Sequence, residues 1–235
     1  MVFYRGCEGD TVGTMYYLDI DDLETHLISS EANGNPGGFD FDGMKWVVWV
    51  DEVGTSVVNW LWKYDVLNGV GPTLVQSGMT QITWPKIDDG KVYSGIWDSP
   101  ADLTNKCDVR VHDLDTNVGN WVFSSPWDQI GPTVSGNVLA YEDTEELAHN
   151  WFEDQTSYLE LYDLDTGVTR KLTDVAFGYT GIARHDKYFA YNAGDLLILC
   201  DLEAGGFIDS TGHVCPEGGC PELDGGVDGG ADAGE

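Results

Sequence analysis

A strand-like segment that ends in aspartate recurs five times along this 235-residue chain. The five aspartates are Asp19, Asp65, Asp113, Asp163 and Asp201, in the segments YYLD, WKYD, RVHD, ELYD and ILCD. Their spacing is roughly 40–50 residues, and the intervening sequence carries strand signals without helical periodicity. A repeat of this length and kind is typical of the blades of a β-propeller.

Two further series of residues keep the same period. An aromatic side chain near the end of the preceding strand recurs at Tyr4, Trp49, Trp97, Tyr141 and Tyr191. A turn before that strand recurs at Asp42-Gly43, Asp89-Gly90, Ser135-Gly136 and His185-Asp186. Because an aromatic residue recurs in every repeat, we expect these rings to pack in the core rather than to form a carbohydrate platform.

The clearest repeat, residues 131–174, predicts one four-stranded antiparallel unit. Its strands are expected at 132–135, 138–141, 158–162 and 168–172, with the hairpin loop DLDTG before the last one. The sequence of a turn, an apolar strand, YDLDTG and RKLT resembles the TolB-like, or PD40-type, β-propeller repeat. This resemblance covers roughly residues 1–205. It implies a fold rather than an activity, since propellers serve both as binding modules and as enzymes.

The chain is therefore expected to be all-β, a β-propeller of four-stranded antiparallel blades in residues 1–209 with about five repeats visible. The first repeat begins at its second strand. If residues 207–208 paired with that repeat, the ring would close with five blades; the alternative is a fragment of a six- or seven-bladed propeller. Residues 210–235 are rich in Gly, Asp and Glu, which predicts a disordered acidic tail.

Charge narrows the range of partners. The chain has 11 basic and 41 acidic residues, a formal net charge of −30. That balance excludes a nucleic-acid-binding footprint and favours cationic partners or divalent cations. No apolar run is long enough for a membrane span. Few lysines, five cysteines and the spacer-like tail favour an extracytoplasmic location: periplasmic, secreted or cell-surface.

Two long connections, 98–107 and 142–157, are expected to emerge on one face of the disc. They carry acidic side chains together with a histidine and a tryptophan, a composition that fits a protein partner, preferably a basic one, or a calcium ion. The candidate binding residues are Asp98, Asp102, Glu142, Asp143, Glu145, Glu146, His149, Trp151, Glu153 and Asp154. The alternative is a solvated loop held down by its aromatic residues.

Repeated aspartate pairs such as Asp113 and Asp115 also suggest calcium, but aspartate commonly opens hairpin turns, and we favour that structural role. No catalytic residues or metal ligands are assigned. We expect a non-enzymatic binding or scaffold module that recognises another protein through one propeller face. The alternative function is a carbohydrate-binding or glycoside-hydrolysing propeller. It would need channel carboxylates, for which Asp40, Asp88 and Asp89 are the candidates.

Overall fold

The computed structural model describes residues 2–7, 13–32, 36–52, 59–79, 81–97, 107–122, 127–144, 157–171, 182–185, 188–193, 196–201, 206–209 and 214–215. Every regular element in these ranges is a β-strand, and the strands form five antiparallel sheets. No helix of the described residues is long and apolar enough to cross a membrane.

Each sheet is a meander of strands consecutive in sequence. Sheet I holds β1 (Val2–Cys7), β2 (Gly13–Leu18) and β3 (Thr25–Ala32). Sheet II holds β4 (Pro36–Phe41), β5 (Trp46–Glu52), β6 (Asn59–Asp65) and β7 (Val70–Met79). Sheet III holds β8 (Gln81–Asp88), β9 (Lys91–Trp97), β10 (Cys107–Asp113) and β11 (Val118–Trp121). Sheet IV holds β12 (Asp128–Ser135), β13 (Val138–Thr144), β14 (Ser157–Asp163) and β15 (Thr169–Lys171). Sheet V holds β16 (Ile182–His185), β17 (Tyr188–Ala193), β18 (Leu196–Asp201), β19 (Gly206–Asp209) and β20 (Val214–Cys215).

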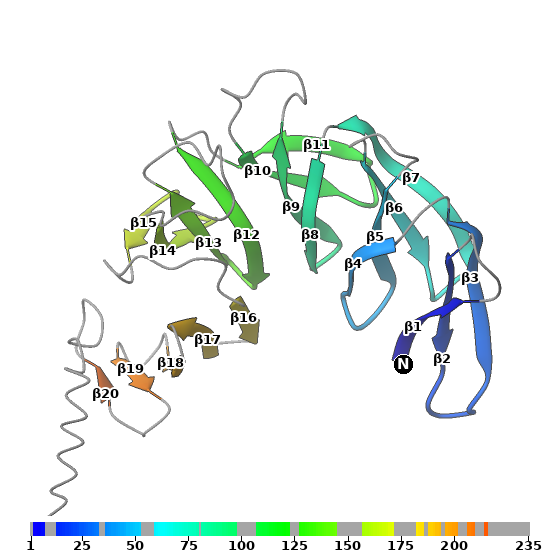
Figure 1. The fold of residues 1–235 in the computed structure, drawn as a ribbon, viewed down its shortest axis with the longest axis horizontal. Coiled ribbons are helices and arrows are strands. Elements are labelled where there is room, and N and C mark those ends of the chain that lie inside the picture. The colour runs from blue at the N-terminus through cyan, green and yellow to red at the C-terminus, as the bar shows by residue number, and fades with distance from the viewer. Residues whose placement is uncertain are drawn as a thin grey trace, which may run out of the picture.

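The five sheets follow one another along an open arc (Figure 1), with β4, β8, β12 and β16 on its inner side. This is the blade-by-blade arrangement that the repeat predicts. The five-bladed closure that pairing of residues 207–208 with the first repeat would give is not formed, because β19 pairs with β18 as the fourth strand of its own sheet. Beyond it, β20 adds a fifth strand from within the segment expected to be a tail.

Strand pairing confirms the repeat at the third-strand aspartate and corrects it at the aromatic residue. Trp46, Lys91 and Val138 begin the second strands of sheets II to IV and pair with Asp65, Asp113 and Asp163. In this register Trp49 and Tyr141 are equivalent, but the third repeat places Ser94 there. The expected Trp97 instead occupies the position of Glu52. The sequence pattern selected Trp97 because Ser94, at the equivalent position, is not aromatic.

Apolar residues fill the spaces between adjacent sheets. Trp49 packs with Tyr17 and Tyr64 between sheets I and II, and Tyr141 packs with Tyr93 and Leu139 between sheets III and IV. Trp49 and Tyr141 are almost completely buried, so the expected core role of the aromatic residues is confirmed at these two positions. A third cluster, which contains Val48, Leu61 and Ile87, joins sheets II and III. Complete burial of one such side chain stabilises the folded state by roughly 1.5–3 kcal/mol.

Aspartates also link neighbouring sheets directly. Asp40 of β4 accepts a hydrogen bond from the backbone N–H of Ile87 at 2.9 Å. Asp88 of β8 accepts one from the backbone N–H of Gly136. These are two of the carboxylates considered for a channel hydrolase. In the structure they connect sheet II to sheet III and sheet III to sheet IV.

Candidate functional site

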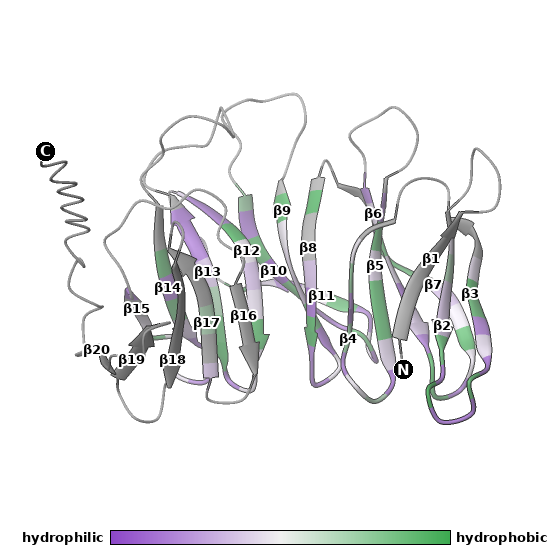
Figure 2. Ribbon diagram, turned by 60° about the horizontal axis from the view of Figure 1, so that its bottom comes forward, coloured by the Kyte–Doolittle hydropathy of each residue, from purple (hydrophilic) through white to green (hydrophobic). Residues whose placement is uncertain are grey.

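The sheets have two chemically different ends. We call the end with the tight strand-to-strand turns at residues 19–24, 42–45, 66–69, 89–90, 114–117, 136–137 and 164–168 the turn end; it is the lower edge in Figure 2. The opposite end is the loop end, where β5, β9 and β13 finish and β6, β10 and β14 begin. The two long acidic connections start from the loop end.

Carboxylates are buried at the loop end. Among the described residues they are Asp51, Asp108, Asp128, Glu142 and Asp143. Asn59, Gln76 and Gln129 lie among them and are buried as well. Removing an ionised carboxylate from water is costly unless it is hydrogen-bonded or paired. A purely structural core would be expected to contain few buried carboxylates, so finding five of them at the loop end suggests a further role.

Hydrogen bonds hold part of this group in place at the boundary between sheets III and IV. Asp128 Oδ1 accepts from the backbone N–H of Cys107 at 2.7 Å and so fixes the first residue of β10. Gln129 Nε2 donates to Asp143 Oδ2 at 3.2 Å and to the carbonyl of Trp127 at 2.7 Å. Connection 98–106 therefore ends at a hydrogen-bonded residue, Cys107, and connection 145–156 begins just after another, Asp143.

The aspartate in sheet II sits in a more apolar position. Asp51 is two residues beyond Trp49 on β5, so the two side chains share a face. Burial raises the pKa of Asp51, and the Trp49 side chain offsets part of that rise. Its Oδ1 is buried without a hydrogen-bond partner. The charged form of Asp51 therefore weakens the fold rather than stabilising it.

The structure tests only part of the expected site. Glu142 and Asp143 lie in β13 and are buried, so they form the base of the loop end rather than an exposed ledge. The other expected residues lie outside the described ranges: Asp98, Asp102, Glu145, Glu146, His149, Trp151, Glu153 and Asp154. Sequence reasoning missed Asp108 and Asp128. The available signal was a charged residue at a strand terminus beside a long connection.

Aspartates at the turn end have a structural role. Asp163 Oδ1 accepts hydrogen bonds from the backbone N–H groups of Asp165 and Thr166, both at 2.9 Å. Asp113 does the same for Asp115 and Thr116. The hydrogen bonds from Thr116 hold the pKa of Asp113 below its ordinary value. The structural interpretation of the repeated aspartates is confirmed in these turns.

Two lysines reinforce the turn end between sheets II and III. Lys45 pairs with Asp115 at 2.7 Å, and its Nζ lies 4.2 Å from the ring centroid of Trp46. Lys63 is buried, lies 4.9 Å from the same centroid and donates to the carbonyl of Leu114. The hydrogen bond to Asp115 raises the pKa of Lys45, whereas burial lowers that of Lys63.

A histidine replaces tyrosine in the third repeat. His112 precedes the third-strand aspartate, where sheets II and IV carry Tyr64 and Tyr162. It is 3% exposed, and burial lowers its pKa to about 4, with a smaller contribution from the charge of Arg110. A Cβ added at Gly119 would lie 2.3 Å from its Nε2. The ring is thus packed against the outer strand β11.

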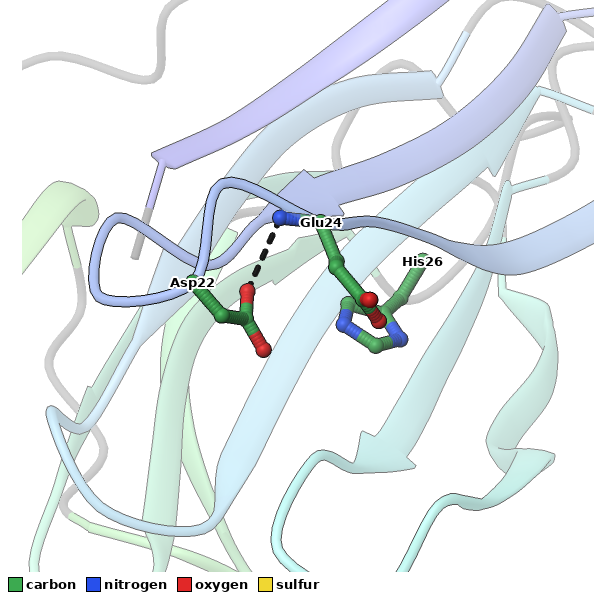
Figure 3. Close-up of side chains that lie close together, drawn as sticks. All are labelled: Asp22, Glu24 and His26. Carbon is green, nitrogen blue, oxygen red and sulfur yellow. Dashed lines mark hydrogen bonds between the residues drawn. The ribbon is translucent and has the colours of Figure 1, made fainter.

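The turn between β2 and β3 carries three side chains that could bind a metal ion, a combination that differs from those of the other turns described above. The side chains of Asp22, Glu24 and His26 each offer one ligand atom, and these atoms lie within 4.8 Å of one another. Figure 3 shows the Glu24 carboxylate against the His26 ring, with Asp22 directed to the same side of the turn. Asp22 Oδ1 accepts the backbone N–H of Glu24 at 2.8 Å. The sequence signal was three ligand-type side chains within five residues, at the turn that leads into β3.

Comparison with solved structures identifies the fold. The tricorn protease, a β-propeller protease, matches with a TM-score of 0.61 at 11% identity, over 87% of this chain and 25% of that chain. The computationally designed Ika4 protein matches with a TM-score of 0.50 at 15% identity, over 75% of this chain and 98% of that chain. This chain has a β-propeller-like fold. It spans about a quarter of the tricorn protease, and at these identities the likeness concerns the fold alone.

Comparison with known sequences does not assign the chain to a family. No protein-family model matches the chain, and no curated protein sequence matches it. The function must therefore be argued from the chemistry of the two ends.

Proposed function

We propose that this chain is a non-enzymatic, extracytoplasmic binding module of the TolB-like kind, with propeller blades that present the loop end to a basic segment of another protein. The observation that carries the proposal is the set of five buried carboxylates at the loop end. Among these five, Asp128 and Asp143 accept hydrogen bonds, but Asp51 has a raised pKa and a buried oxygen without a partner. Groups that weaken a fold are commonly retained for binding.

Charge supports the choice of a basic partner. With a net charge of −30, the whole molecule attracts cationic proteins, and its field accelerates their association. The connections 98–106 and 145–156 add further carboxylates directly beyond the buried ones. We propose that these connections make the first contact and that the buried base fixes their ends.

The experiment compares two sets of four neutralised carboxylates on arrays of cationic peptides and of glycans. The loop-end variant carries Glu145→Gln, Glu146→Gln, Glu153→Gln and Asp154→Asn. The control carries Asp21→Asn, Asp89→Asn, Asp115→Asn and Asp165→Asn at the turn end. Both have the same net charge, so only position distinguishes them.

We expect the loop-end variant to lose peptide binding at physiological salt and the control to retain it. The control also loses the exposed Lys45–Asp115 pair, which should lower its free energy of unfolding only slightly, because exposed ion pairs contribute little to stability. Equal loss in both variants would mean that net charge alone attracts the peptides. Unchanged binding in the loop-end variant would overturn the assignment. Binding to glycans but not peptides would replace it with the carbohydrate-binding alternative.

A further inference from the structure

The same hairpin frame occurs in four of the sheets, and only the first of these turns carries a set of metal-ligand side chains. One residue in each turn adopts a left-handed backbone conformation: Leu23 (φ 62°), Gly69 (63°), Asn117 (59°) and Gly167 (71°). Glycine and asparagine adopt this conformation at least cost, so three of the four turns follow backbone preference. The first turn instead carries a leucine flanked by Asp22 and Glu24.

The four turns differ at three positions relative to the residue with the left-handed conformation. The preceding position holds Asp22, Asn68, Thr116 and Thr166. The following position holds Glu24, Val70, Val118 and Val168. The position three residues after holds His26, Pro72, Asn120 and Arg170. A valine suits the start of the outer strand in three sheets. The first turn therefore differs from the other three at all three positions, and at each of them it carries a metal-ligand side chain.

The imidazole of this group is held in a defined orientation. His26 pairs with Tyr17 across β2 and β3, and their rings stack with centroids 4.6 Å apart at 14°. Stacking reduces the freedom that the ring would lose on binding a ligand. The backbone N–H of Glu24 similarly orients the Asp22 carboxylate. Two of the three side chains are thus arranged before any ion arrives.

Electrostatics favours a cation among these groups. The ligand atoms of Asp22 and Glu24 lie within 4.8 Å of each other, a distance at which two ionised carboxylates repel. Asp19 and Asp21 in the same turn add to the negative potential. An ion bound between Asp22, Glu24 and His26 would replace this repulsion with attraction.

We propose that Asp22, Glu24 and His26 form a binding site for one divalent transition-metal ion. A nitrogen donor with two carboxylate oxygens suits zinc, manganese or cobalt, whereas calcium and magnesium prefer oxygen ligands alone. The three side chains are at the molecular surface, which leaves the remaining coordination positions open to water or to a ligand from a partner. The site is at the turn end and is independent of the proposed loop-end function.

The test is calorimetric titration of the full chain with Zn²⁺ after treatment with chelator. It compares the wild type with His26→Gln, Glu24→Gln and Asp21→Asn. The last variant removes one charge from the same turn without removing one of the three ligands. A difference between variants is needed, because His213, Cys215 and Cys220 elsewhere in the chain also offer zinc donors.

We expect one equivalent of Zn²⁺ to be lost, or its binding weakened by at least about tenfold, in His26→Gln and Glu24→Gln. Asp21→Asn removes only a nearby charge, so it should weaken binding much less than Glu24→Gln does, and Co²⁺ should show an absorption band that His26→Gln lacks. Equal Zn²⁺ binding in the wild type and His26→Gln would overturn the site. Equal weakening by Asp21→Asn and Glu24→Gln would also overturn it, because that result indicates non-specific attraction to charge.

Discussion

Aspartates at the turn end and Asp51 at the loop end lie in opposite environments, although Asp128 at the loop end also accepts a backbone hydrogen bond. At the turn end, Asp113 and Asp163 accept backbone hydrogen bonds and shape the hairpins. At the loop end, Asp51 is buried on an apolar face and its pKa is raised. A carboxylate stabilises a fold when it has donors to accept from, and weakens it when burial removes water without replacing it. The comparison separates aspartates that stabilise the fold from Asp51, which does not.

The largest expected effect concerns His112 at the turn end. Its pKa in the folded chain is about 4, against 6.5 for an ordinary histidine. Between those values the unfolded chain binds the extra proton, so the free energy of unfolding should rise with pH from about 4 to 6.5. After allowance for solvent screening, we expect about 2 kcal/mol.

The measurement is urea unfolding at several pH values for the wild type and His112→Tyr, which introduces the residue that sheets II and IV carry. The variant should lose the part of the pH dependence that belongs to the histidine, while the carboxylate contribution remains in both proteins. Parallel pH profiles would show that His112 does not set this dependence.

An intermediate effect is expected for Asp163→Ala. The substitution removes the acceptor for two backbone N–H groups, and water replaces it only in part, so the free energy of unfolding should fall by about 1 kcal/mol. Chemical denaturation measures the change. The control is Asp165→Ala in the same turn, where the side chain makes one contact at 3.3 Å to Asn137 and should matter much less. Equal losses would contradict a turn-forming role for Asp163.

The smallest expected effect has the opposite sign. Asp51→Asn removes a charge whose burial disfavours the folded state, so the variant should be more stable than the wild type at pH 7, by less than about 1 kcal/mol. Because burial raises the pKa of Asp51, this gain should shrink as the pH falls and the wild-type carboxyl becomes protonated. Thermal unfolding at pH 7 and pH 4 measures it. A loss of stability at pH 7 would mean that Asp51 has a structural partner and would remove the contrast between the two ends.

Much of the fold was predictable because backbone chemistry repeats locally. Asp163 and Gly167 predict a hairpin. The aspartate accepts hydrogen bonds from backbone N–H groups two and three residues later, and glycine readily adopts the left-handed conformation that the turn needs. The strand register at Trp49 and Tyr141 followed from the same period. The third repeat broke the aromatic series because Ser94 takes the core position, and only strand pairing could show that Trp97 had shifted by three residues. The candidate site was predicted in part: Glu142 and Asp143 were named, but as exposed residues.

The sequence by itself determined the all-β architecture, the blade-length repeat, the turns and the acidic character, since each depends on local preference or on a sum over residues. Only the tertiary structure decided that β19 stays in its own sheet, that Asp128 fixes Cys107, and that Tyr17 orients His26 beside Asp22 and Glu24. Those arrangements join residues from different strands or sheets. Their distances depend on how the strands pair and the sheets pack, which no local pattern records.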